Sequence, residues 1–458
     1  MSSALATNVS VEEIDRVITE SLQRWGIPGA TLGISLGGET IERAYGIGNL
    51  ETGQPVLTES IFRLASISKP FTATLAMTLV DEGLLDFDLP VAAYLPAVGL
   101  ADDAARKTLT MRHLLSHTGG IDCEFPSDTQ QFGSNDDALG TLIENYGELR
   151  QWTQPGELWS YCNTGFWLAG AVISAITGTS FEQAMRDRVF TPLGLERSCY
   201  AADEAIVHPI ALGHNPTSPD STEHKLVKSF AYPRVRRPSG GVISNVRDVL
   251  RFANAHIGLG EKKLLSDESR LAMQQPVTRL RQTSPDFWGI GWEVVDHPQG
   301  KIIGHGGSFG GYQTHLAIVP DRQFAFVILT NSARGSSAFP EIKRYLLDAF
   351  TGIKLTLPET TNLPAERLQQ LSGHFENGSS AVDISAEGQR LKLVAFSQSE
   401  ITGTRQSLPP VYYSPINEYE FVALEGASKG SRLEFFDWKS AEAHFARVGL
   451  RITERIPD

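Results

Sequence analysis

Residues 66–81 have the sequence SISKPFTATLAMTLVD, in which a short polar stretch stands directly ahead of a long apolar run. The run predicts a helix that begins at Ser66 and ends near Asp81, with Pro70 in its first turn, where a missing backbone N–H is tolerated. Ser66 and Lys69 are three positions apart, so on a helix they share one face. An amine beside a hydroxyl can accept its proton and turn the hydroxyl into a nucleophile. Lys69 is the only lysine of the chain with a serine three residues before it, and this pair predicts a serine acyl-transfer enzyme.

The tripeptide Tyr161-Cys162-Asn163 places a phenol and an amide two residues apart. It precedes a strongly apolar helix that we expect over residues 163–176. Acyl transfer needs a group that relays protons to the leaving group, and a phenol near an ammonium is favoured as a phenolate that can act as a base. Tyr161 is therefore a candidate proton relay. Asn163 suits a helix cap as well as a catalytic role, and it can serve as both.

The third motif is His305-Gly306-Gly307-Ser308, which follows a strand expected over residues 301–303, and His305 is a candidate catalytic residue. Glycines at these positions let a substrate lie against the backbone, so Gly306, Gly307 and Ser308 are candidate substrate-binding residues. The backbone N–H groups of Ser66 and Ser308 are candidates for an oxyanion hole. Residues 306–310 also match Gly-x-Ser-x-Gly, the nucleophile elbow of α/β-hydrolases, but that elbow requires a helix after the serine, and the following residues are strand-like.

The order of predicted elements indicates one sheet built from both ends of a larger domain, with helices between. A capping box at residues 10–13 starts the first helix, and a β-hairpin is expected at 30–36 and 39–45 around Gly37-Gly38. Further helices are expected at 110–116, 180–190, 244–256 and 337–350, and strands at 313–319 and 324–329. A Pro/Thr/Asn-rich linker at 357–364 precedes short alternating stretches at 382–384, 391–394, 418–424, 432–436 and 443–448. These stretches predict a small antiparallel β-barrel or sandwich of about 95 residues. We therefore expect a domain over 1–356, a linker over 357–364 and a second domain over 365–458.

In their order, Ser66-x-x-Lys69, Tyr161-x-Asn163 and His305-Gly306-Gly307 resemble the serine β-lactamase and penicillin-recognising family. The branch that they resemble holds class C β-lactamases, D-Ala-D-Ala carboxypeptidases, D-aminopeptidases and family VIII esterases. Residues 114–120 and Pro155-Gly156 are similar to that branch as well, so the resemblance covers about residues 10–350.

The resemblance implies an α/β (α+β) sandwich, in which an antiparallel sheet is flanked by helices and the site lies between sheet and helices. It implies that Ser66 is the nucleophile, that Lys69 and Tyr161 exchange its proton, and that Asn163 hydrogen-bonds Lys69 and the substrate amide. The C-terminal β-domain is similar in architecture to the lipocalin-like barrels of D-aminopeptidases and of the peptide cyclases of nonribosomal peptide pathways.

One position departs from the pattern of the family. β-Lactamases and carboxypeptidases usually have Lys-Thr-Gly at the third motif, where the cation helps to bind the substrate carboxylate, whereas this chain has His305. Histidine is neutral over much of the range around pH 7. The departure favours a serine hydrolase of D-amino-acid-containing peptides or amides, or of carboxylic esters. The first alternative is a peptide cyclase or acyltransferase that uses the same acyl-enzyme, and the second is a penicillin-binding protein that does not turn over.

Composition and charge limit the partners that we expect. The 458 residues include 40 Lys and Arg against 53 Asp and Glu, a formal net charge of −13, which argues against nucleic acid or an anionic membrane as the main partner. Cys123, Cys162 and Cys199 are too few and too widely spaced for a disulfide framework. No signal peptide and no membrane-spanning run is visible, so we expect a cytoplasmic protein with a small-molecule or short-peptide substrate. No cofactor is expected and no metal, because the pair His113 and His117 lacks the glutamate of a His-Glu-x-x-His site. The sequence does not indicate the oligomeric state.

Overall fold

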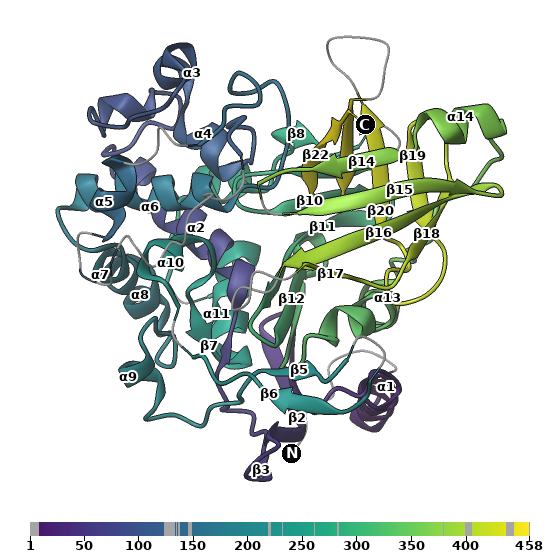
Figure 1. Cartoon of the computed structure of the whole chain (residues 1–458). Coiled ribbons are helices and arrows are strands. Elements are labelled where there is room, and N and C mark those ends of the chain that lie inside the picture. The colour runs from purple at the N-terminus through teal and green to yellow at the C-terminus, as the bar shows by residue number, and fades with distance from the viewer. Residues whose placement is uncertain are drawn as a thin grey trace. The chain divides into compact units, whose positions relative to one another are not determined.

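The computed structural model describes residues 9–122, 133, 135, 138–144, 149–218, 221–230, 232–260, 262–281, 284–378, 380–398, 405–436 and 444–457. The chain divides into two compact units (Figure 1). The first unit comprises Met1–Ile121, Ser127–Trp159 and Asn163–Lys354, and the second comprises Asp122–Pro126, Ser160–Cys162 and Leu355–Asp458. The short segment 160–162 is thus grouped with the second unit, although the residues on both sides of it belong to the first.

An antiparallel sheet organises the first unit. Within the described ranges it has nine strands, in the spatial order β3 (Gln54–Pro55), β2 (Glu39–Asn49), β1 (Gly29–Leu36), β13 (Phe324–Thr330), β12 (Tyr312–Val319), β11 (Gly300–Phe309), β10 (Glu293–His297), β9 (Asp286–Trp288) and β8 (Thr278–Arg279). β1 pairs with β13 from Ala30↔Thr330 to Leu36↔Phe324. The predicted sheet made from both ends of the domain is therefore confirmed, and so is the hairpin of β1 and β2, whose turn contains Gly37 and Gly38, both with positive φ.

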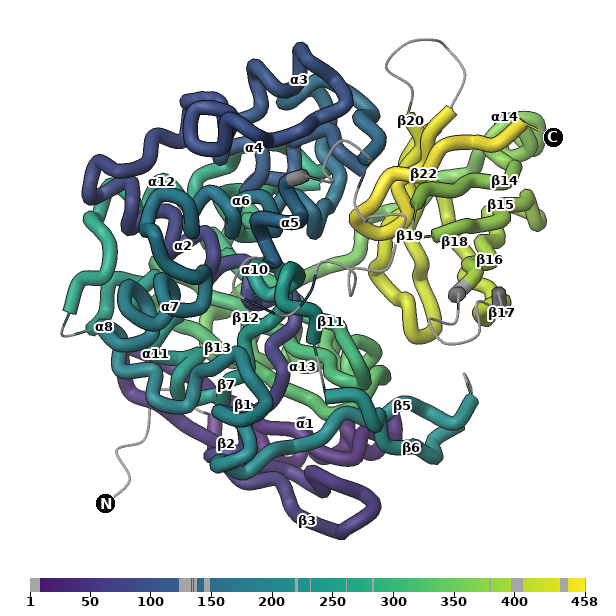
Figure 2. Tube along the Cα trace, turned by 60° about the vertical axis from the view of Figure 1, so that its left-hand side comes forward, coloured from purple at the N-terminus to yellow at the C-terminus, as the bar shows by residue number. Residues whose placement is uncertain are grey.

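Helices cover both faces of this sheet. All seven residues of β13 are buried, as a strand covered on both sides requires. α11 (Val246–Ile257) packs against β1 and β13, and α13 (Gly335–Thr351) packs against β12 and β13 with α1 (Val11–Trp25) beside it. Figures 1 and 2 show α11 on one face and α13 with α1 on the other. The expected sandwich of helices and antiparallel sheet is confirmed.

The remaining helical elements of the first unit belong largely to the stretch between β4 and β8. They are η1 (Ala65–Ile67), α2 (Ser68–Asp81), η2 (Val91–Ala93), α3 (Asp103–Thr108), α4 (Met111–Leu115), α5 (Ala138–Glu144), α6 (Asn163–Thr177), α7 (Phe181–Met185), the π-turn η5 (Arg186–Phe190), α8 (Thr191–Leu193), α9 (Ala202–Ala205), η6 (Arg234–Arg236), α10 (Arg237–Gly240) and α12 (Asp267–Met273), with η7 (Pro320–Arg322) between β12 and β13. Two small pairs of strands accompany them, β4 (Phe62–Arg63) with β7 (Ile243–Ser244) and β5 (His214–Pro216) with β6 (His224–Leu226). α2 and α6 are apolar on nearly every side and pack against each other in the interior.

Three local predictions need correction. The α-helix of the Ser-x-x-Lys motif begins at Ser68, so Ser66 lies in the 3₁₀ turn before it. The helix expected at 244–256 is α11 and begins at Val246, because Asn245 is its cap and its side chain accepts a hydrogen bond from the Asp248 N–H. The strand expected at 301–303 extends over Gly300–Phe309, because pairing with β12 holds the glycine-rich motif in extended form despite its low strand propensity. The nucleophile elbow is excluded, since Ser308 pairs with Gln313 in an antiparallel hairpin.

The second unit is a closed antiparallel barrel that follows the helix α14 (Ala365–Gln370), as Figure 2 shows in green and yellow. Its described strands are β14 (Gly373–Glu376), β15 (Ala381–Glu387), β16 (Arg390–Gln398), β18 (Val411–Pro415), β19 (Glu420–Ala423), β20 (Arg432–Phe436), β21 (Phe445–Val448) and β22 (Arg451–Ile456), with β17 (Arg405–Ser407) attached to β16. The pairing of β15 with β16 closes the ring. Apolar side chains such as Phe375, Phe421 and Phe435 fill the interior together with Leu368 of α14. The predicted small β-barrel is confirmed.

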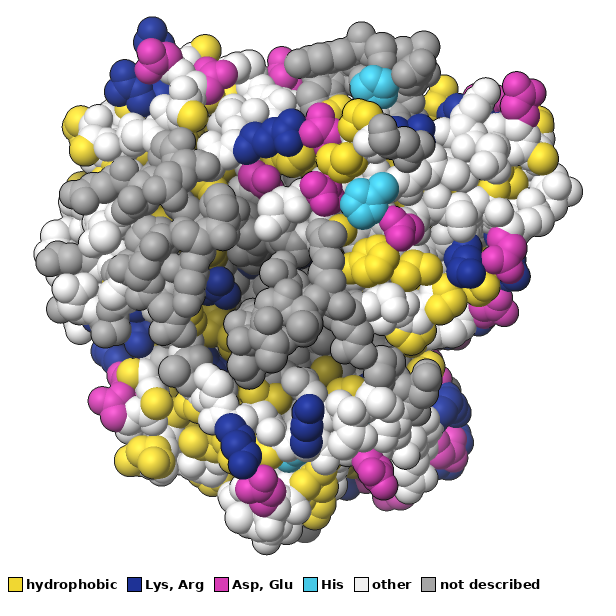
Figure 3. All heavy atoms as spheres, viewed as in Figure 1, with side chains coloured by type: hydrophobic (Ala, Val, Ile, Leu, Met, Phe, Trp, Pro, Cys, Tyr) yellow, Lys and Arg dark blue, Asp and Glu magenta, His cyan; other side chains and the backbone are white. Residues whose placement is uncertain are grey.

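In the part of the chain that the structure describes, no single helix is long and apolar enough to cross a membrane. The bent pair Asn163–Thr177 and Phe181–Leu193 reaches that length and hydropathy only when its two halves are taken together. On the face drawn in Figure 3, acidic and basic side chains are interspersed among the described residues.

Candidate active site

A strained turn presents Ser66. Ala65 has φ 48°, a left-handed conformation that costs a non-glycine residue about 1–3 kcal/mol. The turn connects the buried strand β4 to α2, and Ser66 is partly exposed while the residues on both sides of it are buried. Strain of this kind persists only where the surrounding structure holds it in place. The chain therefore holds the Ser66 side chain open to a reactant on an otherwise buried segment.

Lys69 is fully buried and contacts Ser66. Its Nζ donates hydrogen bonds to Ser66 Oγ at 3.2 Å and to the backbone carbonyl of Ser239 at 2.8 Å, and it lies 5.5 Å from the ring centroid of Phe166. These contacts fix the direction of the amine, since a flexible side chain is held at two polar points and against one ring. The Ser-Lys pair predicted from the spacing is thus in hydrogen-bond contact.

β11 passes directly beside Ser66 through Gly307. A Cβ added there would lie 2.2 Å from the Leu64 carbonyl oxygen, 2.3 Å from Thr314 Oγ1 and 3.1 Å from the Ser66 nitrogen. Only glycine allows this approach, because real Cβ contacts under about 3 Å require a neighbour to move. Thr314 Oγ1 also donates to the Leu64 carbonyl at 2.8 Å, which ties β12 to the same segment. The structure thus brings the third motif and the Ser66 backbone together.

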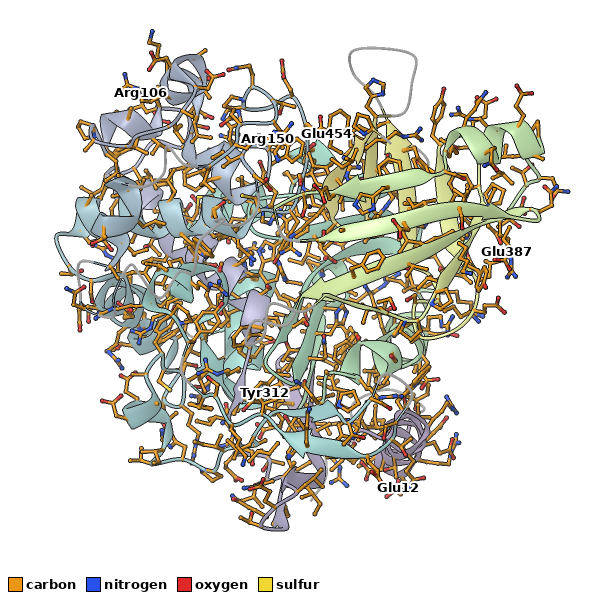
Figure 4. All side chains as sticks on the ribbon, in the orientation of Figure 1. Glu12, Arg106, Arg150, Tyr312, Glu387 and Glu454 are labelled. Carbon is orange, nitrogen blue, oxygen red and sulfur yellow. The ribbon has the colours of Figure 1, made fainter. Side chains whose placement is uncertain are left out.

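β12 is anchored near the segment that carries Ser66 at a second point as well. Tyr312, labelled in Figure 4, donates its hydroxyl hydrogen to the Ala211 carbonyl at 2.9 Å. Its ring meets that of Phe62, four residues before Ser66, edge-on at 6.5 Å between centroids. Contacts of β12 therefore position both β11, which carries the third motif, and the residues just before Ser66.

His305 is a buried, neutral imidazole. It is 2% exposed, its Nδ1 lies 2.5 Å from the Gly306 carbonyl oxygen, and its ring meets Trp288 edge-on at 5.5 Å. Burial lowers the pKa of His305 to about 3, and the nearby positive charge of Lys69 adds to the effect. His305 therefore supplies no cation at neutral pH, as the substitution of His for Lys at this motif suggested.

Ser308 and Gly306, two of the predicted oxyanion and binding residues, both lie in β11. The side chain of Ser308 is exposed and accepts a hydrogen bond from Gln313 Nε2 at 2.7 Å, so its contribution to an oxyanion hole rests on the backbone N–H alone. Gly306 lies on the opposite face of β11 from Gly307, as strand alternation requires. Pairing of β10 with β11 ends at Gly304, so among the described residues the strand beyond it has β12 on one side only.

Asn163 and Tyr161 fall in different units. Asn163 is the first residue of α6, and Phe166, which contacts Lys69, lies three residues later on the same face of that helix. Tyr161 is grouped with the second unit, where its backbone N–H donates to the Leu450 carbonyl at 2.9 Å. The role of Tyr161 in proton transfer stays a prediction.

The sequence analysis did not identify Ser239, which contacts Lys69, or Trp167, which contacts Ser239. The carbonyl that accepts from Lys69 belongs to Ser239, and Ser239 Oγ in turn accepts from Trp167 Nε1 at 2.8 Å. The small-residue run Ser239-Gly240-Gly241 was a signal for close backbone approach that went unused. Of the two histidines considered for zinc, His113 bonds Thr110 at the start of α4, and His117 lies beyond that helix with φ 60°.

Comparison with known proteins gives a consistent result. Residues 14–350 match the family model described as "Beta-lactamase". The chain is 35% identical over 347 residues to penicillin-binding protein 4 of Amycolatopsis lactamdurans, a match that covers 74% of this chain and 90% of that protein. It is 26% identical to penicillin-binding protein 4* of Bacillus subtilis over 86% of this chain and 90% of that protein. Among solved structures, SurE with D-Leu superposes with a TM-score of 0.74 at 25% identity, covering 97% of this chain and 99% of that chain. The chain belongs to the β-lactamase family.

Proposed function

We propose that the chain is a serine hydrolase that acts through a Ser66 acyl-enzyme on an amide or an ester. The observation that carries the proposal is the hydrogen bond between Lys69 Nζ and Ser66 Oγ, made by a lysine that is fully buried. The bond places the amine next to the hydroxyl, and the deprotonated amine can accept the proton of Ser66. Membership of the β-lactamase family supports the same chemistry.

The reaction begins with attack of Ser66 Oγ on the substrate carbonyl carbon while the hydroxyl proton passes to Lys69. The oxyanion that forms accepts hydrogen bonds from the backbone N–H groups of Ser66 and Ser308. The bond from carbon to the leaving nitrogen or oxygen then breaks, and the leaving group takes up the proton through Tyr161. Asn163 hydrogen-bonds Lys69 and the substrate amide. Water attacks the acyl-enzyme in the same way, releases the acid and restores Ser66.

The substrate class that we propose first is peptides or amides with a D-configured residue, and the second is carboxylic esters. The likeness to the SurE structure with D-Leu over nearly the whole chain supports the first class. The neutral His305 supports both classes over efficient β-lactam hydrolysis, since it provides no cation for a carboxylate.

Turnover of D-alanine and L-alanine p-nitroanilides and of p-nitrophenyl butyrate tests the proposal. Ser66→Ala should abolish all three activities, whereas Ser308→Ala, which removes only an exposed hydroxyl, should retain them. Faster turnover of D-alanine p-nitroanilide than of L-alanine p-nitroanilide supports the D-configured substrate class. Wild-type turnover in the Ser66→Ala variant would refute the acyl-enzyme.

A second candidate is a peptide cyclase or acyltransferase, in which an amine or alcohol takes the acyl group in place of water. The additional barrel motivates it, since its architecture is similar to that of the barrels of peptide cyclases. Linear peptide thioesters analysed by mass spectrometry should then give cyclic or transferred products, and exclusive hydrolysis contradicts it.

A third candidate is a penicillin-binding protein that is acylated once, in keeping with the name of the Amycolatopsis relative. Its acyl-enzyme would persist when its mass is followed over time.

A further inference from the structure

The last hairpin of the second unit holds the tyrosine of the Tyr-x-Asn motif by its backbone. The Tyr161 N–H donates to the Leu450 carbonyl at 2.9 Å, and the Ile452 N–H donates to Ser160 Oγ at 3.3 Å. These two bonds run in opposite directions on either side of Arg451. They fix the segment at 160–161 along the turn between β21 and β22.

That turn is itself held in place. Val448 pairs with Arg451 across it, and Gly449 has φ 64°, which lets the chain reverse in two residues. Asn377 Nδ2 donates to the Ile452 carbonyl at 2.7 Å, which ties the turn to the neighbouring end of β14. On the other side of the tyrosine, Cys162 Sγ lies 3.7 Å from the Asp122 carbonyl oxygen. The backbone that carries Tyr161 is therefore a rigid part of the second unit.

One side chain of the turn contacts the tyrosine ring. The guanidinium carbon of Arg451 lies 5.3 Å from the ring centroid of Tyr161, which is within the range of a cation–π contact. Tyr161 is 6% exposed, so little solvent competes with this contact. A planar guanidinium against a ring face restricts rotation of the ring and hence the direction of its hydroxyl.

We propose that Arg451 is a positioning residue for acyl transfer, which acts by holding the ring of Tyr161 in the orientation needed for proton relay. This inference rests on the proposed function of Tyr161. Arg451 lies about 290 positions after the tyrosine in the chain and holds its ring from the β21–β22 turn.

The test is a double-mutant cycle on the acylation rate with D-alanine p-nitroanilide, whose leaving nitrogen must take up a proton, and kcat and KM are measured beside it. Arg451→Met keeps most of the aliphatic stem and removes the guanidinium, and it should lower kcat about 3- to 30-fold with little change in KM. Arg451→Lys should recover most of the loss. In a Tyr161→Phe background, where the hydroxyl is already gone, Arg451→Met should change the acylation rate less than about 2-fold.

Arg390→Met is the matched control, because Arg390 makes the same kind of contact with Tyr412, at 4.6 Å, elsewhere in the barrel. It should leave kcat within about 2-fold of wild type. Acylation rates of Tyr161→Phe variants are read by mass spectrometry, so that slow turnover does not hide the comparison. Thermal melting of each variant checks folding, and Arg451→Gln, which also removes the guanidinium, serves where Arg451→Met does not fold.

Three results would overturn the inference: unchanged kcat in Arg451→Met, losses that add fully in the double mutant, or a rise in KM at unchanged kcat. The last result would place Arg451 on the substrate. Failure of the proposed function is distinct, since it appears as activity in Ser66→Ala. Inactive Ser66→Ala together with fully active Arg451→Met would refute only the inference.

Discussion

Replacing Gly307 by alanine tests whether β11 must lie against the nucleophile. The added Cβ would lie 2.2 Å from the Leu64 carbonyl oxygen and 2.3 Å from Thr314 Oγ1, and these two atoms are already bonded to each other. Neither can turn away alone, so β11 or the Ser66 turn must shift. We expect a loss of about 1–3 kcal/mol in the free energy of unfolding from overpacking. Because the same strand carries the Ser308 N–H, we also expect kcat to fall about 10²- to 10³-fold.

Gly306→Ala is the control for this prediction, since it changes the neighbouring residue of the same strand. A Cβ at 306 meets nothing closer than the Thr314 carbonyl oxygen at 3.8 Å. We expect kcat within about 2-fold of wild type and a change in unfolding free energy of at most about 0.5 kcal/mol. Both variants are measured by turnover of p-nitrophenyl butyrate and by urea denaturation. Equal activity and stability of the two variants would refute the close approach of β11 to Ser66.

Three further predictions concern the buried groups of the first unit. Lys69→Met should lower kcat about 10²- to 10⁴-fold, because it removes the amine that bonds the nucleophile; turnover within 10-fold of wild type would contradict that role. The pKa values of His305 and His256, both about 3 because of burial, lie below the ordinary 6.5, so between these values the unfolded chain binds more protons than the folded one. The free energy of unfolding should therefore fall as pH drops from about 6.5 toward 4, by about 1.4 kcal/mol per pH unit for each histidine, and His256→Gln should flatten this slope in denaturation measured at several pH values. Trp167→Phe removes the donor to Ser239 Oγ and should cost about 1–3 kcal/mol of unfolding free energy, read by urea denaturation against wild type.

Local signals were enough to predict much of the first unit. Capping residues, the Gly37-Gly38 turn and the apolar period of α6 act within a few residues, so the sequence shows them directly. The strand β11 was predicted too short, because its glycine-rich half has no strand propensity of its own and is held by pairing with β12. The short strands β8 to β10 were not predicted at all, since two to five residues carry too weak a period.

In the candidate site, too, contacts between residues near in sequence could be predicted and contacts between distant residues could not. The Ser66–Lys69 contact follows from a spacing of three residues, and the structure confirms the contact. The Ser239 carbonyl could not be predicted, because any backbone oxygen is a possible acceptor and only the tertiary fold selects one. The attachment of Tyr161 to the turn at 448–451 was equally hidden, since no local pattern links residues so far apart in the chain.

The pairing of β1 with β13 also bears on how the enzyme is made. β1 leaves the ribosome early, but the strand that must lie beside it is completed only at Thr330. At about 5–20 residues per second, the roughly 290 residues between them take about 15–60 s to synthesise. Throughout that interval the apolar edge of the first hairpin is open to wrong partners, which makes the nascent chain a candidate client for chaperones that shield strand edges. β11, which lies against Ser66, is synthesised more than 200 residues after it, so the surroundings of Ser66 are completed only when β11 has been made.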